Sequence, residues 1–532
     1  MKKRRYRILM AVLLICFLAA AVRILFILDT GVEGEAQGQP GAAAEEITDP
    51  VSKPEDSAGE PDGSDVEPDR SAGEPDGSAG EADRPAEERG ESGKKDNSSG
   101  RENNGGACSA AEGESPASSS DAVRQPPRLA VASDLHYQSA QTTDYGKAFE
   151  KFVKEGDGKV NAYLPQILDA LIDQLIAQKP DAFLLTGDIT INGERINHLE
   201  LAERLERLNQ AGIQTLVIPG NHDINNYRGR LYFGEEETET ESVSLEEFTE
   251  IYADFGWNQA ISRDRASFSY VYPLRERVWL MLLDTAQYEP LNIVDGAVRQ
   301  ETLLWIRENL EAARAAGIQV VVSGHHNLLQ ESRMFTTMCV LENSSEVVEL
   351  LEEYQVPLYI SGHLHLQRIQ KHKREPGAEG YGICEIVSDA LSIPPCQYGL
   401  LSWTDDGTLA YETLQTDVSG WAERSGQTDE NLLNFEAYQR RYVRELIRDQ
   451  ILDQTVRVPE ETAVEMAELY AEIYADYCAG IPISRQAAER SEGYQSWARY
   501  LPDSNSFQEI KAMLKDSLQD NNHFLLPVEE WD

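Results

Sequence analysis

Residues 215–223 read TLVIPGNHD, and the organisation of the chain follows from how this stretch ends. Its apolar run, LVI, is short and rich in β-branched residues, which predicts a buried strand. Gly220 permits a sharp turn after the strand, so Asn221, His222 and Asp223 follow directly at its carboxyl end. Open α/β sheets bind their ligands at this end of their strands, and the sequence therefore predicts a functional site here.

The same pattern of apolar strand, small-residue turn and metal-binding side chain recurs four more times. Predicted strands at 129–133, 183–187, 320–324 and 358–362 are followed by DLH, D, HH and HLH, respectively. Six of the nine histidines in the chain lie in these blocks or in the first one. This clustering predicts one site built from several strand ends.

Strand and helix patterns alternate between residues 128 and 415, which predicts an α/β domain with parallel strand pairing. Helical spacing at 161–178 and 198–211 separates the first three strands, and later strands indicate a second sheet. The acidic stretch 234–247 is predicted to be a mobile surface loop.

The N-terminus combines KKRR at residues 2–5 with an apolar run that ends at residue 28. A basic flank before about twenty apolar residues predicts that 1–28 is a signal-anchor. We therefore expect a single-pass protein of the cell membrane, with its catalytic domain outside the cytoplasm. The alternative is secretion after signal cleavage, because the alanines at 19–21 offer a cleavage site.

Two regions flank the α/β domain. Residues 29–127 are dominated by Gly, Ser, Ala, Pro, Glu and Asp. They cannot bury enough apolar surface to offset the entropy lost on ordering, so we expect a disordered acidic linker. Residues 416–532 show helical spacing at 435–452 and 462–479 without metal-binding clusters, which predicts a helical C-terminal region.

Charge and cysteine content narrow the function classes. The net charge of −44 argues against nucleic-acid binding through a basic surface. The cysteines show no C-x-x-C spacing, so neither a zinc knuckle nor a thioredoxin-like site is predicted. Cys384 and Cys396 flank a predicted hairpin, and they are either a disulfide pair or buried thiols. The oligomeric state stays open.

The five blocks place carboxylate, amide and imidazole groups together, a donor set that suits divalent Mn, Fe or Zn. The candidate ligands are Asp134, His136, Asp188, Asn221, His325, His363 and His365. Seven ligands exceed what one ion needs, whereas two ions that share a bridging carboxylate would use them all. Two such ions can polarise a phosphoryl oxygen and generate a hydroxide nucleophile.

The ordered set DxH, GD, GNHD, GHH and GHxH closely resembles the calcineurin-like metallophosphoesterases over roughly residues 128–415. The stretch 186–194, TGDITINGE, is similar to a bacterial branch of phosphohydrolases likened to cyclic-nucleotide phosphodiesterases. The resemblance implies a four-layer α/β/β/α sandwich of two mixed sheets, here with a helical appendage.

By the same resemblance, the chain hydrolyses a phosphate ester, preferably a phosphodiester, through a metal-bound hydroxide and without a covalent phosphoenzyme. Two alternatives stay open. One is a phosphomonoesterase such as a nucleotidase, and the other is a cell-surface binding protein that keeps its metals without catalysis.

The resemblance also implies a role for each residue of the blocks. The first ion takes Asp134, His136, Asp188 and His365, and the second shares Asp188 and adds Asn221, His325 and His363. His222 stays free of metal and protonates the leaving group. We expect Asp223 to orient the imidazole of His222, because a carboxylate behind an imidazole fixes its tautomer.

The fourth block departs from the family pattern, since Asn327 follows the histidine pair where the family often has proline. We expect His325 to be the ligand because it comes first after the strand, and His326 to face the substrate or to support the site. Arg228 and Arg230 follow the GNHD turn and are candidates to bind a phosphate group, with solvent-facing ion pairs as the alternative.

Overall fold

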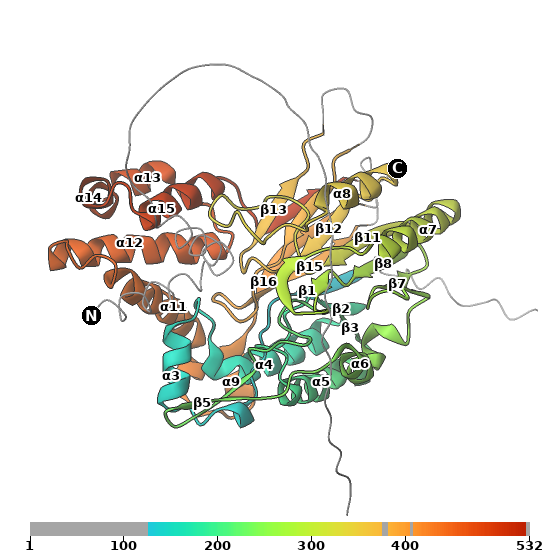
Figure 1. Ribbon diagram of the computed structural model, residues 1–532, viewed down its shortest axis with the longest axis horizontal. Helices are drawn as coiled ribbons and strands as arrows, with labels where there is room; N and C mark the ends of the chain where they lie inside the picture. Colours follow the sequence, from blue (N-terminus) through green and yellow to red (C-terminus); the bar gives the residue numbers. More distant parts are fainter. Residues whose placement is uncertain (1–125, 375–380, 405–407, 528–532) are drawn as a thin grey trace, which may run out of the picture. The chain divides into compact units, whose positions relative to one another are not determined.

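The computed structural model describes residues 126–374, 381–404 and 408–527 (Figure 1). The predicted anchor at 1–28 and nearly all of the predicted linker at 29–127 lie outside these residues, and both stay predictions. Among the helices of the described ranges, none combines the length and the hydropathy that a membrane span requires.

The first of two large sheets has six strands in the order β17-β16-β15-β1-β2-β3. Its strands are β1 (Arg128–Ala132), β2 (Ala182–Leu185), β3 (Gln214–Val217), β15 (Gln397–Trp403), β16 (Leu409–Gln415) and β17 (His523–Leu526). The first three pair in parallel and the last three are added antiparallel, which makes the sheet mixed.

The second sheet has seven strands in the order β13-β14-β12-β11-β8-β7-β6. They are β6 (Ser262–Arg263), β7 (Tyr270–Arg275), β8 (Val278–Leu283), β11 (Gln319–Gly324), β12 (Leu358–Ser361), β13 (Arg368–Lys371) and β14 (Cys384–Val387). β8, β11, β12 and β14 are parallel, and antiparallel strands close both edges.

Alternating side chains of β8 show how the layers stack. Leu280 and Leu282 share a buried cluster with the first sheet, α4 (Leu164–Gln178) and α5 (Arg195–Gln210). Met281 and Leu283 point the other way, into a cluster with α7 (Gln300–Ala316) and α8 (Ser344–Glu353). Helices thus cover the outer face of each sheet (Figure 1), which confirms the predicted four-layer α/β/β/α arrangement.

The acidic stretch predicted to be a surface loop is instead a hairpin followed by a helix. β4 (Arg230–Phe233) pairs with β5 (Glu236–Glu239) across a turn at Gly234, and α6 (Leu245–Ile251) follows. One exposed glutamate of β5, Glu237, pairs at 2.8 Å with Lys151 of the neighbouring helix α3 (Lys147–Lys154). The run of acids suggested a loop because its cationic partners lie far away in sequence.

The remaining elements of this domain are short. They are η1 (Ala140–Thr142), η2 (Asn161–Tyr163), η3 (Ala253–Trp257), β9 (Ala286–Gln287) and β10 (Ile293–Gly296). Cys384 and Cys396 are buried free thiols, and Cys384 lies in β14 of the second sheet whereas Cys396 precedes β15 of the first.

The C-terminal region is helical, as its spacing predicts. Its helices are α9 (Val418–Arg424), α10 (Glu430–Leu433), α11 (Phe435–Leu452), α12 (Glu460–Cys478), α13 (Arg485–Arg490), α14 (Glu492–Tyr500) and α15 (Asn505–Asp516). Their core also takes in Phe335, Leu364 and Leu366 of the α/β domain. The chain then returns to the first sheet, where β17 pairs with β16.

Trp497→Ala is expected to lower the free energy of unfolding by ~3–5 kcal/mol, because it empties a fully buried site of the helical core. It also removes the hydrogen bond from the indole Nε1 to the Met466 carbonyl, 2.8 Å long. Urea unfolding of the full chain measures the loss. Tyr500 lies on the same helix and is 38% exposed, so Tyr500→Ala should change the free energy of unfolding by no more than about 0.5 kcal/mol. Equal losses in the two variants would contradict the assignment of Trp497 to this core.

Candidate metal centre

The carboxyl ends of β1, β2, β3, β11 and β12 meet where the two sheets face each other, and short hydrogen bonds tie the loops that follow them. The Asp134 N–H donates to the Gly187 carbonyl at 3.1 Å, and the Gly362 N–H donates to the His325 carbonyl at 3.0 Å. A bond from the His363 N–H to Asp134 Oδ2, 2.9 Å, joins the first sheet to the second. The His222 N–H donates to Asp188 Oδ1 at 2.7 Å and adds the block after β3, so all five blocks found in the sequence contribute to one site.

Five of the seven candidate ligands have a left-handed backbone. The φ angles are 50° at Asp134, 44° at His136, 48° at Asp188, 72° at His363 and 54° at His365. Such a conformation costs a non-glycine residue on the order of 1 kcal/mol, and it persists where the surrounding structure enforces it.

Four side chains form a first cluster: Asp134, His136, Asp188 and His365 each offer one ligand atom, all within 4.8 Å of one another. His365 Nε2 lies 3.0 Å from His136 Nε2 and 3.3 Å from Asp134 Oδ1. This is the set predicted for the first ion.

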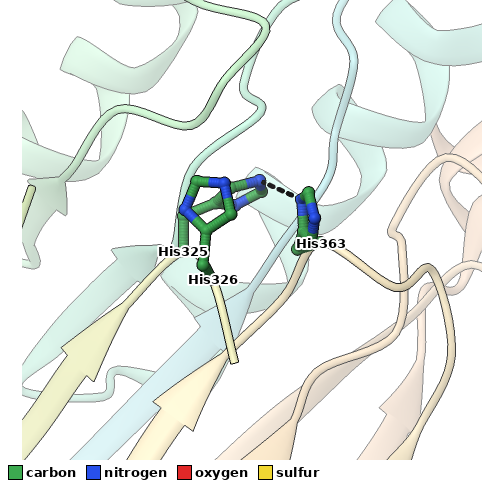
Figure 2. A group of neighbouring side chains, drawn as sticks. All are labelled: His325, His326 and His363. Carbon is green, nitrogen blue, oxygen red and sulfur yellow. Dashed lines mark hydrogen bonds between the residues drawn. The ribbon is translucent and has the colours of Figure 1, made fainter. Parts of the chain in front are cut away.

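The second group of possible ligands is His325, His326 and His363 (Figure 2), and His325 brings it against Asp188. His325 Nε2 is 3.3 Å from Asp188 Oδ2 and 3.2 Å from His363 Nδ1 (Figure 2). Asn221 lines the same cavity. Asp188 thus faces both groups, which is the position that a bridging carboxylate requires.

Unsatisfied polar atoms test whether these residues fit a pair of cations. Asp134 Oδ1 and Asn221 Oδ1 are buried without a hydrogen-bond partner, which is costly in a structure that lacks a cation there. The other carboxylate oxygens are occupied, since Asp188 Oδ1 accepts the His222 N–H at 2.7 Å and Asp134 Oδ2 accepts the His363 N–H. One oxygen of each carboxylate is left for a ligand bond.

The remote nitrogens of three histidines are held by acceptors. His325 Nδ1 donates to the Thr186 carbonyl at 2.9 Å, and His363 Nε2 donates to the Met338 carbonyl at 2.8 Å. His365 Nδ1 donates to Asp157 Oδ2 at 2.7 Å. In the neutral rings these bonds leave the inward nitrogen with a lone pair, as metal-ligating histidines need. The residues therefore fit two divalent ions.

The pKa values of Asp188 and His325 show that the site between the two clusters favours positive charge. Burial opposes the ionised form of Asp188, but the neighbouring His325 and His222 outweigh it and hold the Asp188 pKa well below its usual range. Burial also opposes the charged form of His325, yet Asp188 and Asp134 raise its pKa to about 9. A buried anion that stabilises a cation beside it is suited to a metal ion.

The expected pairing of Asp223 with His222 is wrong. The Asp223 carboxylate accepts the backbone N–H groups of Ile189, Thr190 and Gly220, and it therefore holds the turn rather than the imidazole. His222 Nδ1 donates instead to the Ile191 carbonyl at 2.6 Å and lies 3.0 Å from Asn192 Oδ1. These acceptors direct its Nε2 toward Asp188 Oδ2, 3.9 Å away.

For His326 and Arg230 the structure favours the second of the two expected roles, since Arg230 also pairs with Glu239 at 3.5 Å. His326 is fully buried, with Nδ1 2.8 Å from the Thr285 hydroxyl and Nε2 2.9 Å from the Val294 carbonyl, so it supports the loop. Arg230 donates to the Tyr227 and Gly229 carbonyls within its own hairpin. Arg228 does line the cavity over the metal centre.

The cavity over the metal centre has a volume of about 190 Å³, and some of the residues that line it were not predicted from the sequence. Asp157 and Lys159 enter from the turn after α3, and Phe152 and Phe335 supply aromatic wall. Lys159 Nζ lies 2.5 Å from Asp157 Oδ2. The only sequence signal is the polar turn EGDGK at 155–159, which is typical of any surface loop.

Comparisons with known proteins agree with this geometry. Residues 127–367 match the family model described as calcineurin-like phosphoesterase, and residues 417–520 match the model described as the C-terminal domain of cyclic nucleotide phosphodiesterase. A search of curated proteins found no match.

Similar solved structures each cover 55% of the chain. A dimetal phosphatase from Danio rerio has 12% identity and a TM-score of 0.41, with 97% of that chain covered. GAP50, the anchor in the inner membrane complex of Plasmodium, has 11% identity and a TM-score of 0.33, with 85% covered. Purple acid phosphatase PPD1 from yellow lupin (Lupinus luteus) has 14% identity and a TM-score of 0.36, with 51% covered.

Stripping divalent ions with a chelator is expected to lower the melting temperature of the full chain, and MnCl₂ should restore it. An ion at a hundred times its Kd stabilises the folded state by about 2.7 kcal/mol. Asp188→Asn should lose most of this shift because both clusters depend on that carboxylate, whereas His523→Gln, at an exposed histidine of β17, should keep it. Melting curves that are identical with and without metal would exclude a tight site.

Proposed function

The chain belongs to the calcineurin-like phosphoesterases, and on this premise we propose that it hydrolyses a phosphodiester at the Asp188 centre. Membership of the family makes it a metal-dependent hydrolase of phosphate esters. The observation that supports the proposal most directly is the position of Asp188, with one cluster on each side and His222 against it.

The ligand assignment follows the two groups. We propose that Asp134, His136, Asp188 and His365 hold one ion, and that Asp188, Asn221, His325 and His363 hold the other. When bound, two such ions polarise a phosphoryl group and lower the pKa of a water molecule. The mixture of nitrogen and oxygen donors without thiolate favours Mn, Fe or Zn.

His222 is the proposed acid for the leaving group. Its Nδ1 proton is held by the Ile191 carbonyl and Asn192 Oδ1, so Nε2 is the ring atom that takes up and gives away the second proton. Nε2 is the ring atom directed toward the centre, and His222 lines the cavity. An imidazolium at this place donates its Nε2 proton to the departing ester oxygen, which otherwise leaves as an alkoxide.

The preference for a diester rests on the C-terminal match, whose family model is described by cyclic nucleotide phosphodiesterase. Arg228 lines the cavity and provides a cation for a non-bridging phosphate oxygen. A monoesterase would bind a more highly charged phosphate in the same cavity, so the two activities differ in substrate charge and not in the metal ligands.

His222→Ala is expected to lower kcat by ~10²–10⁴-fold on a dialkyl phosphodiester, which has only an alkoxide to expel. The loss should be much smaller on bis(p-nitrophenyl) phosphate, because p-nitrophenolate departs without a proton. Steady-state kinetics of the Mn-loaded full chain measure both.

Asn221→Ala and His523→Gln accompany this experiment as matched variants. Asn221→Ala should lose activity on every ester, since a ligand is removed, and His523→Gln should resemble the unmodified chain. Equal losses of His222→Ala on both leaving groups would contradict its role as an acid. Faster turnover of p-nitrophenyl phosphate than of the diester would identify a monoesterase.

A further inference from the structure

The turn between α3 and η2 carries two charged side chains to the metal centre. Asp157 is 93% buried and its Oδ2 accepts the His365 Nδ1 proton at 2.7 Å. Lys159 projects into the same cavity with a side chain that is 15% exposed, and its Nζ contacts Asp157 at 2.5 Å. The ammonium has three N–H donors, and the contact with Asp157 uses one of them.

The backbone of this turn is held by the C-terminal helices. From α11, Gln450 Nε2 donates to the carbonyls of Lys154 and Gly156, at 3.0 and 2.9 Å. The Tyr442 hydroxyl, also on α11, donates to the Lys159 carbonyl at 2.8 Å. From α12, the Tyr474 hydroxyl reaches the Asp157 carbonyl at 3.3 Å.

Packing adds to these bonds. Gly158 has a φ of 110°, and a Cβ added there would lie 3.1 Å from a methyl group of Val443 on α11. Figure 1 shows α3 beside α11, and both helices line one groove. A polar turn with no strand partner of its own has few local contacts to order it, so the conformation of residues 154–159 depends on α11 and α12.

From this arrangement we propose that Lys159 binds a phosphate oxygen of the substrate and that α11 and α12 position it through the backbone of its turn. The inference rests on the proposed function for the identity of the ligand. Lys159 touches the substrate and is therefore a binding residue. Tyr442 and Gln450 reach the substrate only through Lys159 and are positioning residues. The C-terminal region is then part of the active site and not an appendage.

The charges around Lys159 favour this role. Lys159 contacts the same Asp157 oxygen that accepts the His365 Nδ1 proton, and this one contact leaves two N–H groups of the ammonium to donate to a ligand. Arg228 lines the same cavity and adds a second cationic side chain to that of Lys159. A phosphate ester that enters this cavity meets both cations.

Lys159→Ala is expected to raise KM for bis(p-nitrophenyl) phosphate so that kcat/KM falls roughly 10- to 100-fold, with kcat changed little, as the loss of one charge-assisted hydrogen bond predicts. Lys159→Arg should recover part of the affinity. Mn stoichiometry is measured on every variant, because Lys159 adjoins the carboxylate that orients His365. An unchanged KM in a folded, metal-loaded Lys159→Ala chain would overturn the proposal.

The positioning role is tested by a double-mutant cycle. Tyr442→Phe and Gln450→Ala should each raise KM in the unmodified chain, but should add little in the Lys159→Ala background. Tyr470→Phe is the matched control, because its hydroxyl donates to Glu509 of α15 within the helical region. Effects of Tyr442→Phe and Gln450→Ala that add fully to those of Lys159→Ala would overturn the link between the helices and Lys159.

Binding of inorganic phosphate to the Mn-loaded chain, measured by calorimetry, separates this inference from the proposed function. Lys159→Ala should weaken phosphate binding by a similar factor even when no ester is turned over. If the unmodified chain binds phosphate but hydrolyses neither ester, the proposed function is wrong. The phosphate affinities of the unmodified chain and of Lys159→Ala still test the role of Lys159 in that case. Phosphate affinity that is equal in the two chains would refute the role of Lys159.

Discussion

The buried carboxylate of Asp188 faces three imidazole rings, and the rest of the site depends on this arrangement. Its Oδ2 lies 3.3 Å from His325 and 3.9 Å from both His136 and His222. An ionised carboxylate removed from water costs several kcal/mol unless cations or donors replace the solvent. The chain supplies one backbone donor, from His222, and leaves the remaining oxygen to the cations.

That requirement explains the backbone around the centre. The strands that end here belong to two different sheets, so their side chains meet only if the loops turn back sharply across the sheet edge. Gly187, with a φ of 97°, allows the approach of His325, since a Cβ there would lie 2.6 Å from His325 Nδ1. Gly220 allows the approach of Asp188 in the same way, because an added Cβ would overlap Asp188 Oδ1. Glycine is therefore required at both positions, because the centre has no space there for a side chain.

The sequence predicted much of this centre because strand ends carry a readable signal. An apolar run followed by a small residue and a ligand-type side chain occurs five times, and parallel strands direct their ends to one edge. The long helices were predicted for a similar reason, and α11 has the predicted bounds of 435–452. Both patterns involve residues that are close in the sequence, so they can be recognised without knowing which residues they contact in the folded chain.

Other features depend on contacts between distant residues, and the sequence could not show them. Asp157 and Lys159 lie in a turn whose relevance comes from His365, more than 200 positions later. Asp223 follows His222 in the chain, yet its carboxylate turns to the backbone of the β2 loop. β17 is four residues long, and it is placed by pairing with β16 and by burial of Leu526 in the core of the α/β domain.

The most direct test of the account is the anomalous diffraction of crystals of the full chain grown with MnCl₂. Two peaks about 3.5–4 Å apart, one on each side of the Asp188 carboxylate, are the predicted result. One set of ligands should come from Asp134, His136 and His365, and the other from Asn221, His325 and His363. A single peak, or peaks away from Asp188, would contradict a dinuclear centre bridged by this residue.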